Sequence, residues 1–215
     1  MNTNTYSPTQ EQFQRELNGA TIETLLDNGL YRHRRFRLPN GCIRWFDIIT
    51  WPDSLIITGD CETFAFERLE DMFEFFRSAG SRINPSYWQE KIIDGRDRAR
   101  SFDWDRFRAE ALAKFDESKI DAEDSELRAA AREDLEEAID ATNPDEWGAV
   151  QLLREYGYTL DGQSGPSYFY FDLSESPPDG MDWDYHYIWC CRAIVWAIQK
   201  YDEEKANAEK ETLEV

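Results

Sequence analysis

The 215-residue chain carries 44 acidic and 24 basic residues, which gives it a formal net charge of −20 at pH 7, and 14% of its residues are aromatic. Acidic chains that remain disordered are poor in aromatic residues, so this composition excludes an unstructured acidic chain and indicates a packed core. No apolar run approaches the roughly 20 residues that span a bilayer, and the first residues lack the apolar stretch of a secretory signal, so we expect a cytoplasmic protein.

Residues 28–68 are predicted to form an antiparallel sheet of about four strands. Turn sequences such as Pro39-Asn40-Gly41 separate strand-like segments over residues 30–38, 42–51, 55–58 and 61–66. The segment 42–51 has apolar residues on both faces, so we expect a central strand that is covered on both sides. Residues 9–27, before the sheet, have the apolar spacing of a helix.

Residues 69–158 are predicted to be helical and include the most acidic part of the chain. Apolar residues recur with helical spacing in the segments 69–78, 85–94, 102–117, 124–141 and 146–156. Residues 1–100 contain 15 acidic and 13 basic residues, whereas residues 101–147 contain 16 and 6. An acidic field confined in this way repels nucleic acid and attracts basic surfaces.

A strand is predicted within residues 167–173, and we expect it to join the N-terminal sheet. Residues 185–201 are apolar on every side of a helix, which indicates a central helix surrounded by protein. Residues 202–215 are charged and are predicted to fray. Together the elements predict a single α+β domain over residues 1–215, in which an N-terminal antiparallel sheet packs against several helices, one of them a buried C-terminal helix.

The sequence gives little sign of catalysis. It contains no GxxxxGK[ST], GxGxxG, GxSxG or HExxH motif. It has two histidines and four cysteines without CxxC spacing, which argues against a structural zinc site. We therefore expect no enzymatic activity, no cofactor and no metal, and we expect the cysteines to be reduced, buried small hydrophobes: Cys42, Cys61, Cys190 and Cys191.

The best local candidate for a metal site is the alternation of Asp182, Asp184 and His186. On a strand these side chains point the same way, and two carboxylates with an imidazole suit a divalent metal. The structural interpretation is that one aspartate caps the following helix and His186 packs beneath it. The metal site belongs to our alternative hypothesis, a metal-dependent enzyme or binding protein that acts on a nucleotide or nucleic acid.

Two further features allow either a structural or a chemical role. Asp47 shares a strand face with apolar residues, so it requires a cation such as Arg35 or Arg44, or else it is a catalytic carboxylate with a raised pKa. Asp60 is a turn residue. The basic run 31–37 interleaves arginines with aromatic residues and has the composition to follow a phosphate backbone, but we favour ion pairs with the acidic helices, because the net charge opposes nucleic acid.

The densest acidic stretch is the candidate partner-binding surface. Such a run can be a solvated face that only maintains solubility, but neighbouring like charges cost stability, and the excess here is larger than solubility requires. A row of carboxylates can also occupy a basic channel built for nucleic acid. The candidate residues are Asp116, Glu117, Asp121, Glu123, Asp124, Glu126, Glu133, Asp134, Glu136, Glu137 and Asp140.

Several motifs resemble a family of small accessory proteins carried by bacteriophages and prophages. The similar stretches are 45–52 (WFDIITWP), 55–60 (LIITGD), 68–77 (RLEDMFEFFR), 83–88, 189–191 (WCC) and 196–198. The resemblance covers the two ends of the chain well and residues 96–165 poorly. It implies a phage origin, and small acidic accessory proteins of phages are often inhibitors of host defence systems such as CRISPR effectors or restriction enzymes. It supplies no catalytic residues.

These observations lead to one functional expectation. We expect a phage-encoded, non-enzymatic protein that binds and inhibits a nucleic-acid-handling defence complex in the host cytoplasm, through DNA mimicry by the acidic face. The expected partner is a host protein with a basic surface, with no direct contact to nucleic acid or membrane.

Overall fold

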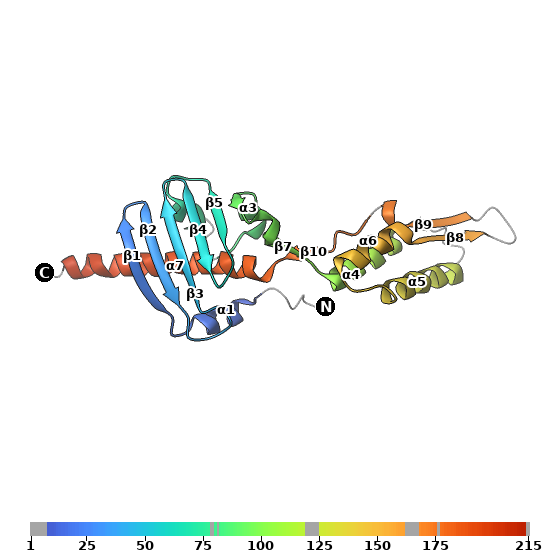
Figure 1. Cartoon of the computed structure of the whole chain (residues 1–215), viewed down its shortest axis with the longest axis horizontal. Coiled ribbons are helices and arrows are strands. Elements are labelled where there is room, and N and C mark those ends of the chain that lie inside the picture. Colours follow the sequence, from blue (N-terminus) through green and yellow to red (C-terminus); the bar gives the residue numbers. More distant parts are fainter. Residues whose placement is uncertain are drawn as a thin grey trace. The chain divides into compact units, whose positions relative to one another are not determined.

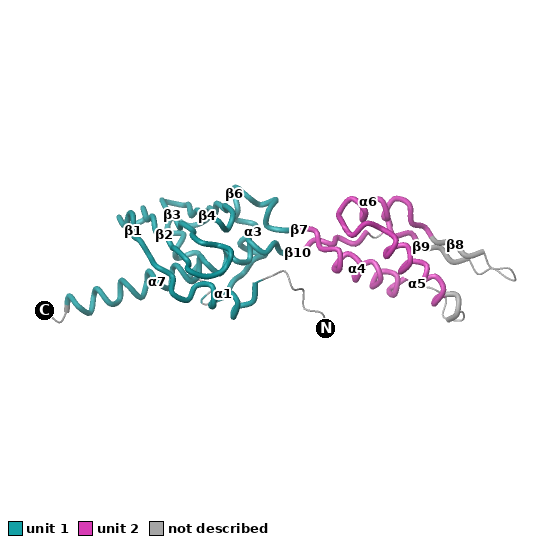
Figure 2. The backbone as a smooth tube through the Cα atoms, turned by 60° about the horizontal axis from the view of Figure 1, so that its bottom comes forward, with its two compact units in different colours: residues 1–100, 183–215 teal, residues 101–182 magenta. Residues whose placement is uncertain are grey.

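The computed structural model describes residues 8–77, 80, 82–118, 125–161, 168–175 and 177–213. It has the expected α+β fold, but the chain divides into two compact units where we expected one. Unit 1 consists of residues 1–100 and 183–215, and unit 2 of residues 101–182 (Figure 2). The physical reason is that the acidic helices bury their apolar stripes against one another, so each unit has its own buried cluster.

Unit 1 contains a six-stranded antiparallel sheet in which the strands follow one another in chain order (Figure 1). About four strands were expected; the two additional strands are the edge strands. The six strands are β1 (Thr21–Asn28), β2 (Tyr31–Arg37), β3 (Trp45–Trp51), β4 (Ser54–Gly59), β5 (Phe64–Glu67) and β6 (Ile92–Asp94).

The helix expected over residues 9–27 is shorter, and its second half is a strand. Helix α1 (Gln10–Leu17) begins with a capping box, in which the Thr9 and Gln12 side chains each bond the other residue's backbone N–H. The chain then turns at Gly19, whose φ of 82° favours glycine, and β1 follows. Pairing with β2 along seven residue positions satisfies the backbone of β1, which outweighs the helical spacing of its apolar residues.

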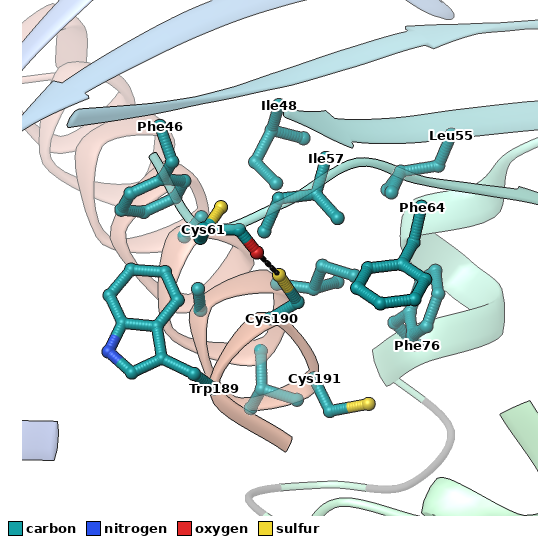
Figure 3. Close-up of a cluster of buried hydrophobic side chains, with 14 of the residues drawn as sticks. Phe46, Ile48, Leu55, Ile57, Cys61, Phe64, Phe76, Trp189, Cys190 and Cys191 are labelled. Atoms are coloured by element: carbon teal, nitrogen blue, oxygen red, sulfur yellow. Dashed lines mark hydrogen bonds between the residues drawn. The ribbon is translucent and has the colours of Figure 1, made fainter. Parts of the chain in front are cut away.

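One face of the sheet is covered by helices. Besides α1, these are α2 (Met72–Arg77), α3 (Pro85–Gln89), the short 3-10 helix η1 (Arg96–Ala99) and the long helix α7 (Tyr185–Leu213). Figure 3 shows Trp189 and Cys190 of α7 among side chains of the strands, and Trp189 packs edge-on against Phe46 at 5.3 Å between ring centres. Tyr187, Trp189 and Cys190 are completely buried, as the prediction of a central C-terminal helix requires.

Two expectations about this unit were not met. The tail 202–215 is not frayed over its described part, because α7 continues to Leu213, and Asp202 is held there by a bidentate ion pair with Arg77. Strand β3 is not fully covered on both sides. Phe46 and Ile48 are completely buried, whereas Trp51 on the opposite face is 38% exposed.

Three of the four cysteines are buried, as expected, but Cys42 is exposed; all four are free thiols. Burial raises the pKa of the Cys190 and Cys191 thiols, so both stay protonated at neutral pH. The Cys190 thiol donates a hydrogen bond to the Cys61 carbonyl at 3.2 Å (Figure 3). These three cysteines are therefore part of the core.

The described residues of unit 2 form three α-helices, a 3-10 helix and a hairpin. The helices are α4 (Trp104–Glu117), α5 (Ser125–Asp140) and α6 (Glu146–Glu155), and the 3-10 helix η2 (Leu173–Glu175) follows the hairpin. Strand β9 (Tyr168–Asp172), which we expected in the N-terminal sheet, pairs with β8 (Gly157–Asp161) instead. The two strands are close in sequence, so their pairing closes only a short loop and costs less entropy than a distant one.

The chain passes between the two units in two short strands, β7 (Arg100–Phe102) and β10 (Met181–Trp183), which pair with each other. In the part of the chain that the structure describes, no helix has the length and apolar character required to cross a membrane.

Candidate functional site: the acidic surface of unit 2

The acidic charge of the protein is concentrated in unit 2. Residues 101–182 hold 22 acidic and 7 basic residues, a net charge of −15, which leaves −5 for the whole of unit 1. Most of the net negative charge of the protein therefore lies on unit 2. That concentration makes unit 2 the strongest candidate for an electrostatic binding surface.

The helices of unit 2 present this charge because their apolar residues follow helical spacing. Phe107, Ala111 and Phe115 on α4 are buried at intervals of four residues. On α5, the buried residues Ala131, Leu135 and Ile139 are four residues apart as well. Acidic residues between these positions must therefore lie on the outward sides of the helices.

Three of the candidate carboxylates are exposed and also lack an ion-pair partner in the described residues. Glu117, Glu133 and Glu137 are exposed, and none of them forms an ion pair with another residue of the described chain. Glu133 and Glu137 are one turn apart on the outer side of α5. Nothing in the described residues prevents a cationic partner from contacting them.

The remaining candidates in the described part have partners inside unit 2. Arg132 pairs with Asp116 at 3.2 Å and also with Glu136. Arg108 pairs with Asp140 at 3.3 Å. The Tyr156 hydroxyl donates to the Asp134 carboxylate at 3.1 Å. Exposed ion pairs contribute little to stability, but these partners partly neutralise the surface.

The predicted site is therefore only partly placed by the structure. Asp121, Glu123 and Asp124 lie outside the described residues, and Glu126 lies in α5 with its side chain outside them. We use the term acidic surface for the seven described carboxylates: Asp116, Glu117, Glu133, Asp134, Glu136, Glu137 and Asp140.

The charge density of α5 can be compared with that of DNA. The helix has six acidic and two basic residues over 16 positions, which corresponds to about one net negative charge per 6 Å at ~1.5 Å per residue. One DNA strand carries one charge per ~3.4 Å. Helix α5 alone thus reaches about half of that density, so a close imitation of DNA requires the neighbouring acids of α4.

Other acidic residues in this unit have structural roles and do not belong to the acidic surface. Asp103 and Asp145 cap α4 and α6 by accepting backbone N–H groups, which their places just before helix starts could have indicated. Glu110 accepts the backbone N–H groups of Asp179 and Gly180 at 2.9 and 3.0 Å. Burial opposes its ionisation, but these hydrogen bonds and Arg106 lower the pKa of Glu110.

The proposed metal ligands do not converge. Asp182 pairs with Arg106 at 3.3 Å, while Asp184 accepts the backbone N–H groups of His186 and Tyr187 at the start of α7. Nδ1 of His186 is buried and has no hydrogen-bond partner in the described chain. Among the described residues, no three His, Cys, Asp or Glu side chains are grouped closely enough to hold a metal ion.

Asp47 and Asp60 likewise have structural partners. Asp47 accepts two hydrogen bonds from Arg35, at 2.9 and 2.8 Å, and lies 2.8 Å from Nε2 of His33. Asp60 accepts the backbone N–H of Arg44 at 2.9 Å. The expectation that a nearby arginine neutralises Asp47 is thus confirmed for Arg35.

The basic run alternates between the two faces of the sheet. Arg32 and Arg34 are buried on the helix-covered face, where Arg32 pairs with Asp71 and Arg34 with Glu204. His33 and Arg35 point to the opposite face. Arg32 and Arg34 are internal, as we expected, but their partners lie within unit 1 and not on the acidic helices; Arg37 is exposed.

A second surface, the partly open face of the sheet in unit 1, was not expected from the sequence. Its residues come from alternate positions of β1–β4 and combine large apolar and charged side chains. We call it the open sheet face and define it by Glu23, Leu26, Tyr31, His33, Arg35, Arg37, Trp45, Asp47, Ile49, Trp51, Ile56 and Thr58. In the sequence, the alternation of side chains along the basic run 31–37 could have indicated this face.

Comparisons of the chain with protein-family models, with curated proteins and with solved structures found no significant match. The class that the structure itself establishes is an α+β protein with an antiparallel sheet and a long C-terminal helix.

Proposed function

We propose that this is a phage-encoded binding protein that blocks a host nucleic-acid-handling defence complex. In this proposal the acidic surface of unit 2 occupies a Lys- and Arg-rich surface on which the complex holds nucleic acid. The observation that carries the proposal is the net charge of −15 on one compact unit, whose exposed carboxylates include three without an ion pair in the described part of the chain: Glu117, Glu133 and Glu137.

The proposed inhibition requires binding alone and no catalytic step. A basic groove that binds DNA gains much of its affinity from electrostatic contacts with phosphates. Carboxylates that are fixed on packed helices offer the same charge without the entropy cost of ordering a flexible chain. Because the long-range field steers association, opposite charge also speeds the encounter with the groove. Binding then excludes nucleic acid by competition.

The proposal is tested by a double charge reversal with a matched control. The variant Glu133→Lys/Glu137→Lys changes the acidic surface, and the control Glu203→Lys/Glu209→Lys makes the same change in net charge on exposed positions of α7. Each tagged protein is used to capture a partner from bacterial lysate, and the captured complex is then titrated with double-stranded DNA.

We expect the wild type and the control to capture the same complex and to compete with DNA for it. The surface variant should bind at least about tenfold more weakly, and added salt should weaken wild-type binding because it screens the charges. Capture that is insensitive to salt, or that both double variants lose equally, would contradict the proposal.

A further inference from the structure

The open sheet face has an ordered pattern that follows from the strand register. Arg35 on β2 is paired in register with Glu23 on β1 and with Asp47 on β3, and Asp47 is paired with Thr58 on β4. A row of alternating charge therefore crosses four strands in the order acid, base, acid, hydroxyl. The Arg35–Asp47 ion pair, with distances of 2.8 and 2.9 Å, fixes the middle of this row.

Apolar residues lie on both sides of the charged row. The next row joins Leu26, His33, Ile49 and Ile56 through the same strand pairings. On the other side of the charged row Arg37 is paired with Trp45. Tyr31 and Trp51 lie beyond the Leu26 row, where β2 begins and β3 ends. Leu26, Tyr31 and Trp51 are 47, 52 and 38% exposed. Exposed aromatic residues and arginines are enriched in protein interfaces.

This face differs electrostatically from the rest of the protein. Its ionised side chains on β1–β4 are Glu23, Asp47, Arg35 and Arg37, two of each sign, whereas the whole chain carries −20. Copies of so acidic a protein repel one another, and a contact between them costs least where the facing surfaces are neutral. The open sheet face is such a surface.

The pattern is also complementary to itself. A two-fold axis parallel to the strands, between β2 and β3, exchanges β2 with β3 and β1 with β4. Two faces packed about this axis place Arg35 opposite Asp47 of the second copy, Arg37 opposite Trp45 and Tyr31 opposite Trp51. Leu26 of one copy then faces Ile56 of the other. Each pair occurs twice, as a two-fold contact requires.

We propose that the open sheet face binds a second copy of this chain and forms a symmetric sheet-on-sheet dimer. Two facing sheets pack about 10 Å apart with side chains from both inner faces between them. In the dimer the two Arg35–Asp47 ion pairs form one group at the centre of the contact: the Arg35 side chains, 32% exposed, face the other copy, whereas Asp47, 4% exposed, stays bonded within its own copy. The exposed apolar rows are buried on both sides of this group.

A single-stranded nucleic acid is the competing occupant, and the structure argues against it. Of the five basic residues in the run 31–37, Arg32 and Arg34 are buried on the other face, and both Arg35 and His33 contact Asp47. Only Arg37 remains exposed without an ion pair in the described chain. One free arginine on an acidic protein provides little attraction for a phosphate backbone.

The test measures the mass of the full chain by light scattering and sedimentation over a wide concentration range. The variants Leu26→Lys and Trp51→Lys place a charge in the proposed interface. Their matched controls are Leu69→Lys and Trp147→Lys, at exposed positions outside the open sheet face. We expect a wild-type dimer, dissociation constants at least tenfold higher for the two face variants, and wild-type behaviour for both controls.

The proposal is overturned if the wild type is monomeric at every concentration, or if the face variants dimerise as well as the controls. Binding of a single-stranded oligonucleotide that the face variants abolish would assign the surface to nucleic acid instead. If Trp51→Lys fails to fold, Leu26→Lys decides, because its side chain is on an edge strand. The double variant Glu133→Lys/Glu137→Lys should remain dimeric, which separates this result from that of the proposed function.

Discussion

Asp47 lies on the open sheet face, yet only 4% of its side chain is exposed. Burial favours the neutral carboxyl group, but the hydrogen bonds from Arg35 and His33 outweigh it and lower the pKa of Asp47. A carboxylate whose pKa is lower in the folded protein stabilises the fold above its unfolded pKa of about 3.9. That stabilisation is lost as the pH falls through the folded pKa.

The first prediction concerns how the stability of the protein changes at acidic pH. The variant Asp47→Asn should unfold more easily than the wild type at pH 7, by about 1 to 3 kcal/mol, because Arg35 loses its charged partner. The difference should shrink as the pH falls below about 4, where the unfolded carboxyl group becomes protonated, and it should be lost below the lowered folded pKa. Urea unfolding at a series of pH values checks this, and a difference that stays constant with pH would contradict it.

Single residues were predictable from sequence where their partners are local. The Arg35–Asp47 pair joins positions 12 apart on neighbouring strands, and Asp184 caps the helix that directly follows it. The partners of the buried arginines were not predictable. Arg32 reaches Asp71 and Arg34 reaches Glu204, at separations of 39 and 170 residues, and only the folded chain brings these charges together.

At the scale of elements, the helices of unit 2 were predicted well, because they bury apolar stripes against one another. Helices α4, α5 and α6 each lie within two residues of their expected bounds. The helix expected over residues 85–94 is wrong in its second half: α3 ends at Gln89, and Ile92–Asp94 is strand β6. Helix α7 extends 12 residues beyond its apolar part, because Arg77, Arg34 and Lys205 tie that extension to the rest of unit 1. Such ion pairs leave no periodic pattern in the sequence.

Truncation of α7 tests this explanation. A chain that ends after Ala206 should keep its stability to within about 0.5 kcal/mol, since the described side chains beyond that residue are exposed. A chain that ends after Tyr201 should lose about 3 kcal/mol or more, because Arg34, 2% exposed, then lacks the Glu204 carboxylate that it contacts at 2.5 Å. Thermal and urea unfolding compare the two; equal stability would contradict the explanation.

At the scale of the whole molecule, the division into two units was the main feature that the sequence did not reveal. Only the return passage is preceded by a Pro- and Gly-containing loop, residues 177–180; at the outward passage the chain runs from η1 directly into β7, which pairs with β10. The hydrogen bonds from Asp184 to Ala99 and from Asp103 to Gly180 lie at the two ends of this pairing. Unit 2 is therefore an insertion between β6 and α7, and the chain leaves unit 1 and re-enters it at neighbouring positions.

The last prediction follows from the separate cores. Replacing residues 103–180 with Asn-Gly, a pair suited to a tight turn between two antiparallel strands, should leave unit 1 folded, because the two buried clusters share no residue. The shortened protein should keep the circular dichroism of its sheet and α7, and it should still dimerise through the open sheet face. It should no longer capture the partner of the acidic surface. Failure of unit 1 to fold would show that its core depends on unit 2, and capture that survives the deletion would place the binding surface elsewhere.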